Sequence, residues 1–232
     1  MLKRFLSGLF PRRCAYCGRV VAADVRMCSS CVKEVPRIDG EICVRCGREK
    51  KKCTCTGAMY YTALAAPFYY SGVVRKGMHS FKFRNSPRNA EAFAFEMAKT
   101  VSERYGGIDF GFIAAVPMDK QGIKARGYNQ VQLLANELSQ KLGVEFKDGL
   151  LVKLYPTEKQ HGLSRILRKG NLTGVFDINE PALVEGKNVL LCDDVSTSGE
   201  TLNECAKMLW LYGAKNIYCI TLAVTENKKE RR

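Results

Sequence analysis

Two adjacent acids mark the stretch of the chain with the clearest chemistry: Asp193 and Asp194 directly follow the continuous apolar run Val189–Cys192. The run predicts a central strand covered on both faces, and the acids would lie at its carboxyl end, where open α/β sheets bind ligands. Small and hydroxyl-bearing residues come next, followed by an apolar stripe at helical spacing that begins at Leu202 and stops at Gly213. Backbone N–H groups at the start of that helix suit a phosphate, whereas the carboxylates suit sugar hydroxyls or a hydrated Mg²⁺. The alternative is an ordinary strand-turn-helix in which Asp and Ser side chains only cap the helix.

Eight of the eleven cysteines lie between residues 14 and 55, and they come in closely spaced pairs. The pairs are Cys14 and Cys17, Cys28 and Cys31, Cys43 and Cys46, and Cys53 and Cys55. A two-residue gap lets both thiolates of a turn face one ion, and four thiolates close a tetrahedral structural zinc site. Pairing consecutive turns closes the shortest loops, so we expect one zinc at the first four cysteines and a second at the last four. A crossed pairing stays open at this point, and free thiols would leave residues 14–57 with almost no core.

The remaining cysteines, Cys192, Cys205 and Cys219, lie in apolar surroundings and are predicted to be buried and inert. Because no secretion signal is evident, the clustered thiols indicate metal ligands in a reducing cytoplasm rather than disulfides. Residues 1–13 carry apolar side chains at helical spacing, which predicts an amphipathic helix docked on the body, with membrane contact as the alternative. No apolar run approaches the ~18 residues of a membrane span, so no transmembrane segment is expected.

The net charge of +14 over 232 residues favours polyanionic ligands such as phosphates, nucleic acid or an acidic membrane surface. Residues 1–57 hold 13 Lys and Arg against 5 Asp and Glu, a net charge of +8. Eight thiolates subtract 8 and two Zn²⁺ add 4, so the metal-loaded segment keeps a charge of about +4. Basic ribbons contact nucleic-acid backbones, but a solvated charged face is an equal alternative.

Apolar segments of strand type and helix type alternate along residues 58–232. Strands are predicted within 59–70 and at 113–116, 150–154, 174–178, 189–192 and 217–224, and helices at 73–84, 87–105, 129–142 and 200–212. This alternation predicts an α/β fold with a parallel sheet and helices on both faces. We therefore divide the chain into residues 1–57, the amphipathic helix and double zinc ribbon, and residues 58–232, the α/β domain.

The acidic stretch resembles the 5-phosphoribosyl 1-pyrophosphate (PRPP) motif of type I phosphoribosyltransferases, in which an apolar run is followed by Asp-Asp, small residues and Thr. Two further blocks precede it: residues 117–130, with Lys124-Ala125-Arg126-Gly127-Tyr128-Asn129-Gln130, and Thr157–Arg165. With the cysteine pairs in front, the order and spacing of these blocks identify the chain as a member of the ComF (competence protein F) family over essentially its whole length. The resemblance implies a parallel-sheet type I phosphoribosyltransferase-like domain preceded by a small cysteine-rich double zinc ribbon.

The resemblance also implies a role for each conspicuous residue. Asp193 and Asp194 would bind the ribose hydroxyls, and the following loop would bind the 5-phosphate through Ser196, Thr197, Ser198, Gly199, Glu200 and Thr201. Lys120 and Arg126 would contact the pyrophosphate, for which Arg126 offers a bidentate fork. The irregular stretch 155–171 is long for a compact domain, as lids are, and its Lys159 and Arg165 would stabilise the charge that leaves as pyrophosphate. The expected catalytic residues are Asp193, Asp194, Lys159 and Arg165.

We therefore expect a cytoplasmic protein that holds two structural zinc ions, binds PRPP with Mg²⁺, and acts in DNA uptake or processing during natural transformation. Its expected partners are PRPP and single-stranded DNA or the DNA-uptake machinery. If the protein is an enzyme, as the motif favours, it transfers a phosphoribosyl group by displacing pyrophosphate at the anomeric carbon. The alternative is a non-catalytic adaptor that retains the fold and binds single-stranded DNA, and a PRPP-sensing regulator is a third option.

Overall fold

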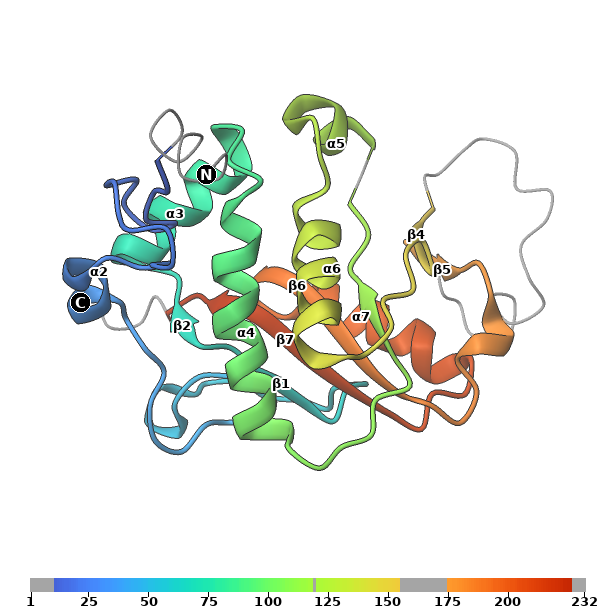
Figure 1. Ribbon diagram of the computed structural model, residues 1–232. Helices are drawn as coiled ribbons and strands as arrows, with labels where there is room; N and C mark the ends of the chain where they lie inside the picture. The colour runs from blue at the N-terminus through green and yellow to red at the C-terminus, as the bar shows by residue number, and fades with distance from the viewer. Residues whose placement is uncertain (1–10, 119, 155–174, 227–232) are drawn as a thin grey trace.

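The computed structural model describes residues 11–118, 120–154 and 175–226, and Figure 1 shows how their elements are arranged. The helices are α2 (Ser29–Glu34), α3 (Gly72–Phe83), α4 (Asn89–Tyr105), α5 (Lys120–Arg126), α6 (Gln130–Leu142) and α7 (Glu200–Leu211), with short 3-10 helices at Lys50–Lys52 and Pro181–Leu183. The strands are β1 (Ala63–Ala65), β2 (Phe68–Tyr69), β3 (Phe112–Ala115), β4 (Leu151–Lys153), β5 (Phe176–Ile178), β6 (Asn188–Ser196) and β7 (Asn216–Val224).

A parallel sheet with the strand order β1-β7-β6-β3 forms the centre of the molecule, and β2 pairs with the end of β7. The long strands β6 and β7 lie side by side in its middle, in a register that places Asp193 opposite Thr221. Because all of these strands run in the same direction, their carboxyl ends lie along one edge of the sheet. This edge therefore collects the ends of β3, β6 and β7.

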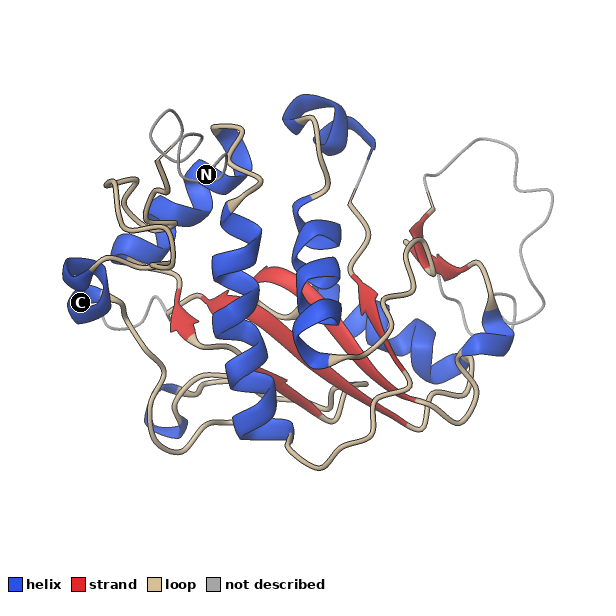
Figure 2. Ribbon diagram, in the orientation of Figure 1, coloured by secondary structure: helices blue, strands red, loops and turns tan. Residues whose placement is uncertain are grey.

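Helices cover the sheet on both faces, as the apolar runs predicted (Figure 2). On one face Leu190 packs in a core with Phe93 of α4 and Leu134 of α6. On the opposite face Leu191 packs in a second core with Leu209 of α7. Successive residues of β6 point to opposite faces, so a strand buried on both sides needs apolar residues at consecutive positions.

Two local features differ from the sequence-based expectation. The strands near 150–154 and 174–178 exist, but β4 and β5 pair with each other in antiparallel fashion and form a small separate sheet. Helix α5 was not expected, because its sequence KQGIKAR has one large apolar residue, Ile123, and no apolar stripe. It begins where the sequence predicted only a turn after the strand that ends near Val116.

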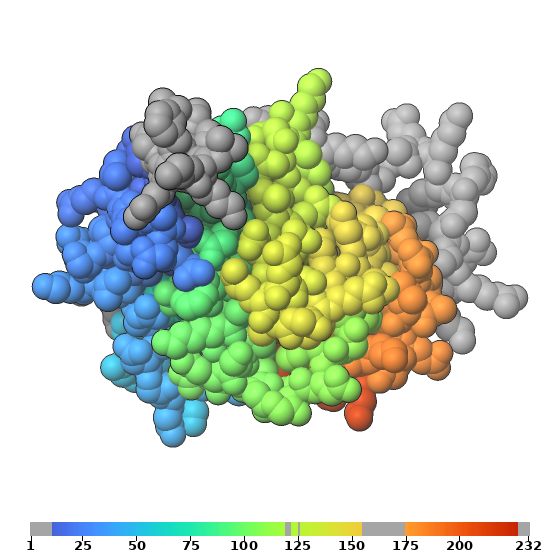
Figure 3. All heavy atoms as spheres, in the orientation of Figure 1, coloured from blue at the N-terminus to red at the C-terminus, as the bar shows by residue number. Residues whose placement is uncertain are grey.

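The cysteine-rich segment packs directly against the α/β part of the chain. The ring of Tyr16 contacts Phe93 of α4 edge-on, with 5.3 Å between ring centroids, and the backbone N–H of Leu64 in β1 donates to the carbonyl of Val44 at 2.7 Å. In Figure 3 the blue surface of this segment continues into the green surface of α4. The boundary at residue 57 stays a prediction, and the predicted helix of residues 1–13 falls largely outside the described residues.

The described helices include none with both the length and the apolar character of a membrane span. The three scattered cysteines are fully buried, as predicted: Cys192 and Cys219 lie in the central strands, and Cys205 lies in α7. Burial raises the pKa of all three thiols, so they remain protonated at neutral pH.

Candidate functional site

A strand, a loop and a helix follow one another as predicted, but β6 continues to Ser196, so Asp193 and Asp194 lie within the strand rather than after it, and α7 begins at Glu200. Between them, Gly199 caps the helix in the left-handed region with φ +85°, a conformation that residues with a side chain rarely adopt. Thr197, Ser198 and Thr201 are exposed around this turn. The first turn of α7 begins at the same loop, where the Glu200 N–H donates to the Ser198 hydroxyl at 3.4 Å, and the N–H groups at a helix start suit an anion. We call residues 196–201 the phosphate loop.

Asp194 points to the face covered by α3 and α6, where two donors hold its carboxylate. Lys82 Nζ lies 2.8 Å from Oδ2 and 2.9 Å from Oδ1, and Gln130 Nε2 donates to Oδ2 at 2.8 Å. Asp194 is only 5 % exposed, and a buried carboxylate of this kind needs such partners to remain ionised. The side-chain amide oxygen of Gln130 (Oε1) is buried and has no hydrogen-bond partner within the described part of the chain, so it offers an acceptor next to this ion pair.

Asp193 points to the opposite face, towards α7. Its Oδ1 accepts the backbone N–H of Asp194 at 2.7 Å, and its charge acts on the buried thiols of Cys205 and Cys219. Burial and the neighbouring Asp194 carboxylate raise the pKa of Asp193 to about 8, although the N–H of Asp194 and the Lys82 ammonium lower it in part. The two acids therefore differ: Asp194 is paired with an ammonium group, whereas the raised pKa of Asp193 lets that carboxyl gain or lose a proton near neutral pH.

The residues that follow β3 contribute a further part of the candidate site. Arg126 closes α5, with its guanidinium 5.3 Å from the centre of the Phe83 ring and Nη1 3.6 Å from the sulfur of Met118. Gly127 turns the chain with φ +79°, and Asn129 then caps α6 by accepting the N–H groups of Val131 and Gln132, as predicted. Lys120 is the first residue of α5. Lys159 and Arg165 lie outside the described residues, so their predicted contacts stay predictions.

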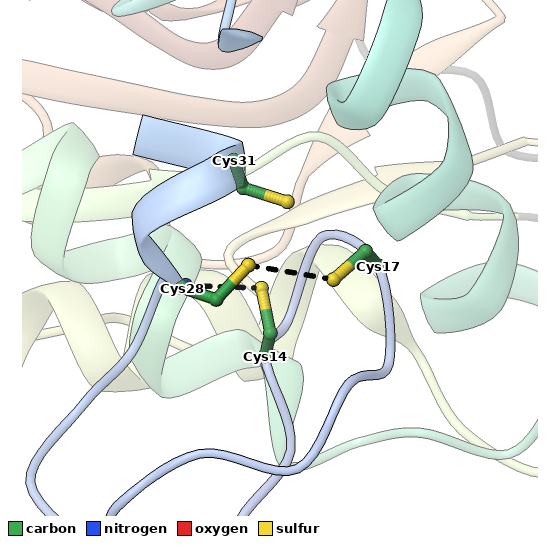
Figure 4. Close-up of side chains that lie close together, drawn as sticks. All are labelled: Cys14, Cys17, Cys28 and Cys31. Atoms are coloured by element: carbon green, nitrogen blue, oxygen red, sulfur yellow. Dashed lines mark hydrogen bonds between the residues drawn. The ribbon is translucent and has the colours of Figure 1, made fainter. Parts of the chain in front are cut away.

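The eight clustered cysteines form two groups of four: Cys14, Cys17, Cys28 and Cys31, and Cys43, Cys46, Cys53 and Cys55. The sulfurs of each group lie within 4.8 Å of one another, and those of the first group point towards a common centre (Figure 4). Tetrahedral Zn–S bonds of about 2.3 Å require sulfurs about 3.8 Å apart, and the observed separations include 3.6 Å for Cys17–Cys28 and 3.5 Å for Cys43–Cys55. The consecutive pairing is therefore the correct one, and both groups fit a zinc ion.

A backbone hydrogen bond in the first group of cysteines also favours metal binding. The backbone N–H of Cys31 donates to the sulfur of Cys28 and lowers the pKa of that thiol to about 7. At neutral pH this group already holds a thiolate for an incoming cation, which is the protonation state a zinc ligand requires.

Two protein families match separate parts of the chain. The double zinc ribbon domain matches residues 5–61, and the phosphoribosyl transferase domain matches residues 122–232. The "DNA utilization protein YhgH" of Salmonella typhi is 30% identical over 207 residues, which cover 88% of this chain and 86% of that protein. "Competence protein ComFC" of Bacillus subtilis is 27% identical over 197 residues, covering 80% of this chain and 78% of the relative. "Competence protein F" of Haemophilus influenzae is 27% identical over 234 residues, covering 94% of this chain and 99% of the relative.

The chain belongs to the ComF family. The family assignment made from the motifs is thereby confirmed, as is the combination of a double zinc ribbon with a phosphoribosyltransferase-type α/β fold. The matched phosphoribosyl transferase domain begins at residue 122, so β1, β2 and β3 come from the stretch between the two matches. In this ComF chain the sheet is therefore completed by residues that neither domain match includes.

Two residues that hold the carboxylate of Asp194 were not predicted from the sequence. Lys82 and Gln130 meet the carboxylate of Asp194 from 112 and 64 residues away in sequence. Lys82 interrupts an otherwise apolar helix end between Phe81 and Phe83, which is the one local indication that it has a buried partner.

Proposed function

We propose that this ComF protein binds PRPP together with Mg²⁺ at the carboxyl edge of the sheet. The observation that carries the proposal is the phosphate loop: exposed hydroxyls and helix N-terminal N–H groups surround a left-handed Gly199, directly after two acids on a central strand. The loop would bind the 5-phosphate, and Asp193 and Asp194 would accept hydrogen bonds from the ribose hydroxyls. The side-chain amide of Gln130 supports this use, because its oxygen has no hydrogen-bond partner among the described residues and could serve as a further acceptor beside Asp194.

The pyrophosphate would lie towards Arg126 and the start of α5. Arg126 provides a fork of donors for phosphate oxygens, and Lys120 adds a second cation at the end of the β3 connection. Bound Mg²⁺ would offset the charge of the diphosphate. Lys82 would keep its ion pair with Asp194, so that the carboxylate is oriented before the sugar arrives.

If the protein turns over, the reaction is a phosphoribosyl transfer. An acceptor atom forms a bond to the anomeric carbon while the bond from that carbon to the pyrophosphate oxygen breaks, and pyrophosphate leaves with the bonding electron pair. The residues of the chain contribute positioning through the phosphate loop and the acids. They also contribute charge stabilisation at the leaving group through Arg126, Lys159 and Arg165.

Calorimetric titration with PRPP and Mg²⁺ tests the site. Asp193→Asn and Asp194→Asn should each weaken binding at least tenfold, about 1.4 kcal/mol, because each replaces a carboxyl oxygen that would accept from a ribose hydroxyl by an amide NH₂ of similar shape, which can only donate. Asp109→Asn is the matched control, since this acid is exposed and precedes β3 at the opposite end of the strand. Equal binding by wild type and both site variants would refute the assignment. Release of pyrophosphate with a panel of nucleobases then separates an enzyme from a protein that only binds.

We further propose that the protein acts in DNA uptake or processing during natural transformation. The relatives named "DNA utilization protein" and "Competence protein" support this role. A strain in which the chain is replaced by its Asp193→Asn variant should lose transformation frequency if ligand binding serves that role. If the variant is present at the wild-type level and the transformation frequency is unchanged, the role in transformation does not depend on ligand binding at this site.

A basic groove supports a second candidate, binding of single-stranded DNA. The groove lies between the first ribbon and α3, has a volume of about 800 Å³, and its basic lining residues are Arg13, Arg75, Lys76, His79 and Arg84. Among the described residues that line it there is no acid. One turn beyond His79, Phe83 is 62 % exposed, and its ring lies 5.1 Å from the imidazole at a tilt of 47°, so it offers a nucleobase an aromatic surface beside the basic residues.

DNA titrations against salt test this candidate. Replacing Arg75 and Lys76 by Ala should weaken binding and reduce the slope of log Kobs against log salt by about 0.7 for each phosphate that the variant no longer neutralises. Lys99→Ala, on the exposed side of α4 and paired with Glu103, is the control. A wild-type protein that retains no DNA even at low salt would remove the candidate.

A further inference from the structure

The two zinc ribbons repeat one short motif, yet they use its last residue differently. The motif C-x-x-C-G-R occurs at Cys14–Arg19 and again at Cys43–Arg48. In both copies the N–H of the first Cys donates to the Arg carbonyl and the Gly N–H donates to the first Cys carbonyl, at distances of 2.7 to 2.9 Å. The two turns are therefore the same local structure. Arg19 is nonetheless exposed, whereas Arg48 is only 8 % exposed.

Arg48 is buried because it reaches the phosphate loop. Its Nη2 donates to the carbonyl of Thr197 at 2.8 Å, and its Nε donates to the carbonyl of Thr225 at 2.6 Å. Thr225 in turn donates to Ser196 and Thr197, through its backbone N–H at 3.0 Å and its hydroxyl at 3.3 Å. One guanidinium thus joins the second ribbon, the start of the phosphate loop and the residue that follows β7.

Tyr61 connects the same ribbon to the surroundings of Gly199. The hydroxyl of Tyr61 donates to the carbonyl of Arg45, between the paired cysteines of the turn, at 2.5 Å. The same hydroxyl lies beneath Gly199, 3.4 Å from the position that a Cβ would occupy there. The turn 43–48 is also fixed to β1 through the bond from Leu64 to Val44. The ribbon therefore contacts the phosphate loop directly at Thr197 and, through Tyr61, lies close to Gly199.

The direction of the Arg48 bond matters for the ligand. In a trans peptide the carbonyl and the following N–H point in opposite directions. A cation bound to the Thr197 carbonyl on the inner side consequently turns the N–H of Ser198 outwards, to the side where a phosphate would lie. The same bond polarises the peptide group and makes that N–H a stronger donor.

We propose that the second zinc ribbon is part of the sugar-phosphate site, with Arg48 as the positioning residue that fixes the phosphate loop. This inference rests on the proposed function. A zinc ion at Cys43, Cys46, Cys53 and Cys55 fixes the turn that carries Arg48, so metal loading of this ribbon sets the affinity of the loop for a 5-phosphate. The first ribbon, whose Arg19 donates instead to Ser30 at 3.1 Å, has no such effect.

The test compares Arg48→Gln, Arg48→Lys and the matched variant Arg19→Gln, each as the full-length, zinc-loaded protein. Ribose 5-phosphate and inorganic pyrophosphate, each with Mg²⁺, serve as probes. We expect Arg48→Gln to bind ribose 5-phosphate at least tenfold more weakly while pyrophosphate binding stays within twofold, because only the 5-phosphate contacts the loop. Arg48→Lys should recover part of the loss, and Arg19→Gln should equal wild type. All three should retain two zinc ions.

Hydrogen exchange of the backbone N–H groups of residues 197–201, without ligand, keeps the two proposals distinguishable. Faster exchange in Arg48→Gln but not in Arg19→Gln supports the positioning role, even if wild type binds no ribose 5-phosphate and the proposed function fails. If wild type binds the sugar phosphate and Arg48→Gln matches it in affinity and exchange, the inference is overturned. Should Arg48→Gln fold poorly, Tyr61→Phe removes only the hydroxyl bond to Arg45, and unchanged affinity and exchange in that variant overturn the inference too.

Discussion

The two zinc ribbons of this chain have the same turn and different neighbours. The first ribbon inserts Tyr16 into the core, edge-on to Phe68 and Phe93, and approaches α3 so closely that a Cβ on Gly77 would lie 2.6 Å from the Ala15 carbonyl. The second ribbon instead lies along β1 and directs Arg48 to the phosphate loop. The motif thus determines how the metal is held, while the packing partners determine what the ribbon does. We expect the first ribbon to act on stability and the second on ligand binding.

The largest expected effect comes from Tyr16→Ala in the first ribbon. Tyr16 is 2 % exposed, and deleting a buried aromatic side chain costs about 3–5 kcal/mol of unfolding free energy. Urea denaturation measures the loss, with Tyr60→Ala, 39 % exposed, as the control. The affinity of the folded fraction for ribose 5-phosphate should not change. A loss below about 1 kcal/mol would show that the first ribbon is not an anchor of the core.

Removing one zinc ligand from each ribbon should separate the two roles directly. Both Cys17→Ser and Cys55→Ser should lower the zinc content from two ions to one, as elemental analysis would report. Cys55→Ser should weaken ribose 5-phosphate binding at least tenfold, or about 1.4 kcal/mol, because the turn that carries Arg48 loses its metal. Cys17→Ser should lower the melting temperature and keep the affinity. Equal losses of affinity in both variants would abolish the distinction.

Glu91 gives the first ribbon a stability that depends on pH. It pairs with Arg12 and Arg26 of the ribbon, and these partners lower the pKa of Glu91 despite partial burial, which raises it. A lowered folded-state pKa gives stability that is present above the unfolded value of about 4.3 and is lost as the pH falls. Glu91→Gln should therefore cost about 1 kcal/mol at pH 7, with the difference from wild type vanishing below pH ~4. A cost that persists in acid would contradict the ion-pair explanation.

Asp193, in the site that we propose the second ribbon supports, should give stability the opposite dependence on pH. Its pKa is raised to about 8 by burial and by Asp194, so between about pH 4 and pH 8 the folded state holds a proton that the unfolded state releases. Stability from this group consequently falls as the pH rises through that window. Between pH 5 and pH 8 the unfolding free energy of Asp193→Asn should therefore rise relative to that of wild type, by less than about 1 kcal/mol per pH unit, when both are denatured in parallel series. If the relative stability of Asp193→Asn instead rose as the pH fell, Asp193 would not be the acid of the pair that holds the proton.

Local patterns predicted those parts of the molecule that depend on neighbours in sequence. Continuous apolar runs predicted the buried strands β6 and β7, and the cysteine spacing predicted both metal groups. The runs could not show that β4 and β5 leave the main sheet, since pairing direction is a property of the whole fold. Nor could spacing reveal the contact of Arg48 with Thr197, which joins positions 149 residues apart. The residues that prepare the site, Lys82, Gln130 and Arg48, are recognisable only once the sheet has brought them together.

The bond from Leu64 to Val44 has a consequence for the solubility of the chain. Strand β1 is the outermost strand on its side of the sheet, and such a strand presents backbone groups that can pair with another molecule. The second ribbon covers part of this edge by occupying the N–H of Leu64. A chain that is starved of zinc would uncover the edge and expose a template for strand pairing between copies. Metal supply would then govern how much of the protein is lost to aggregation during synthesis.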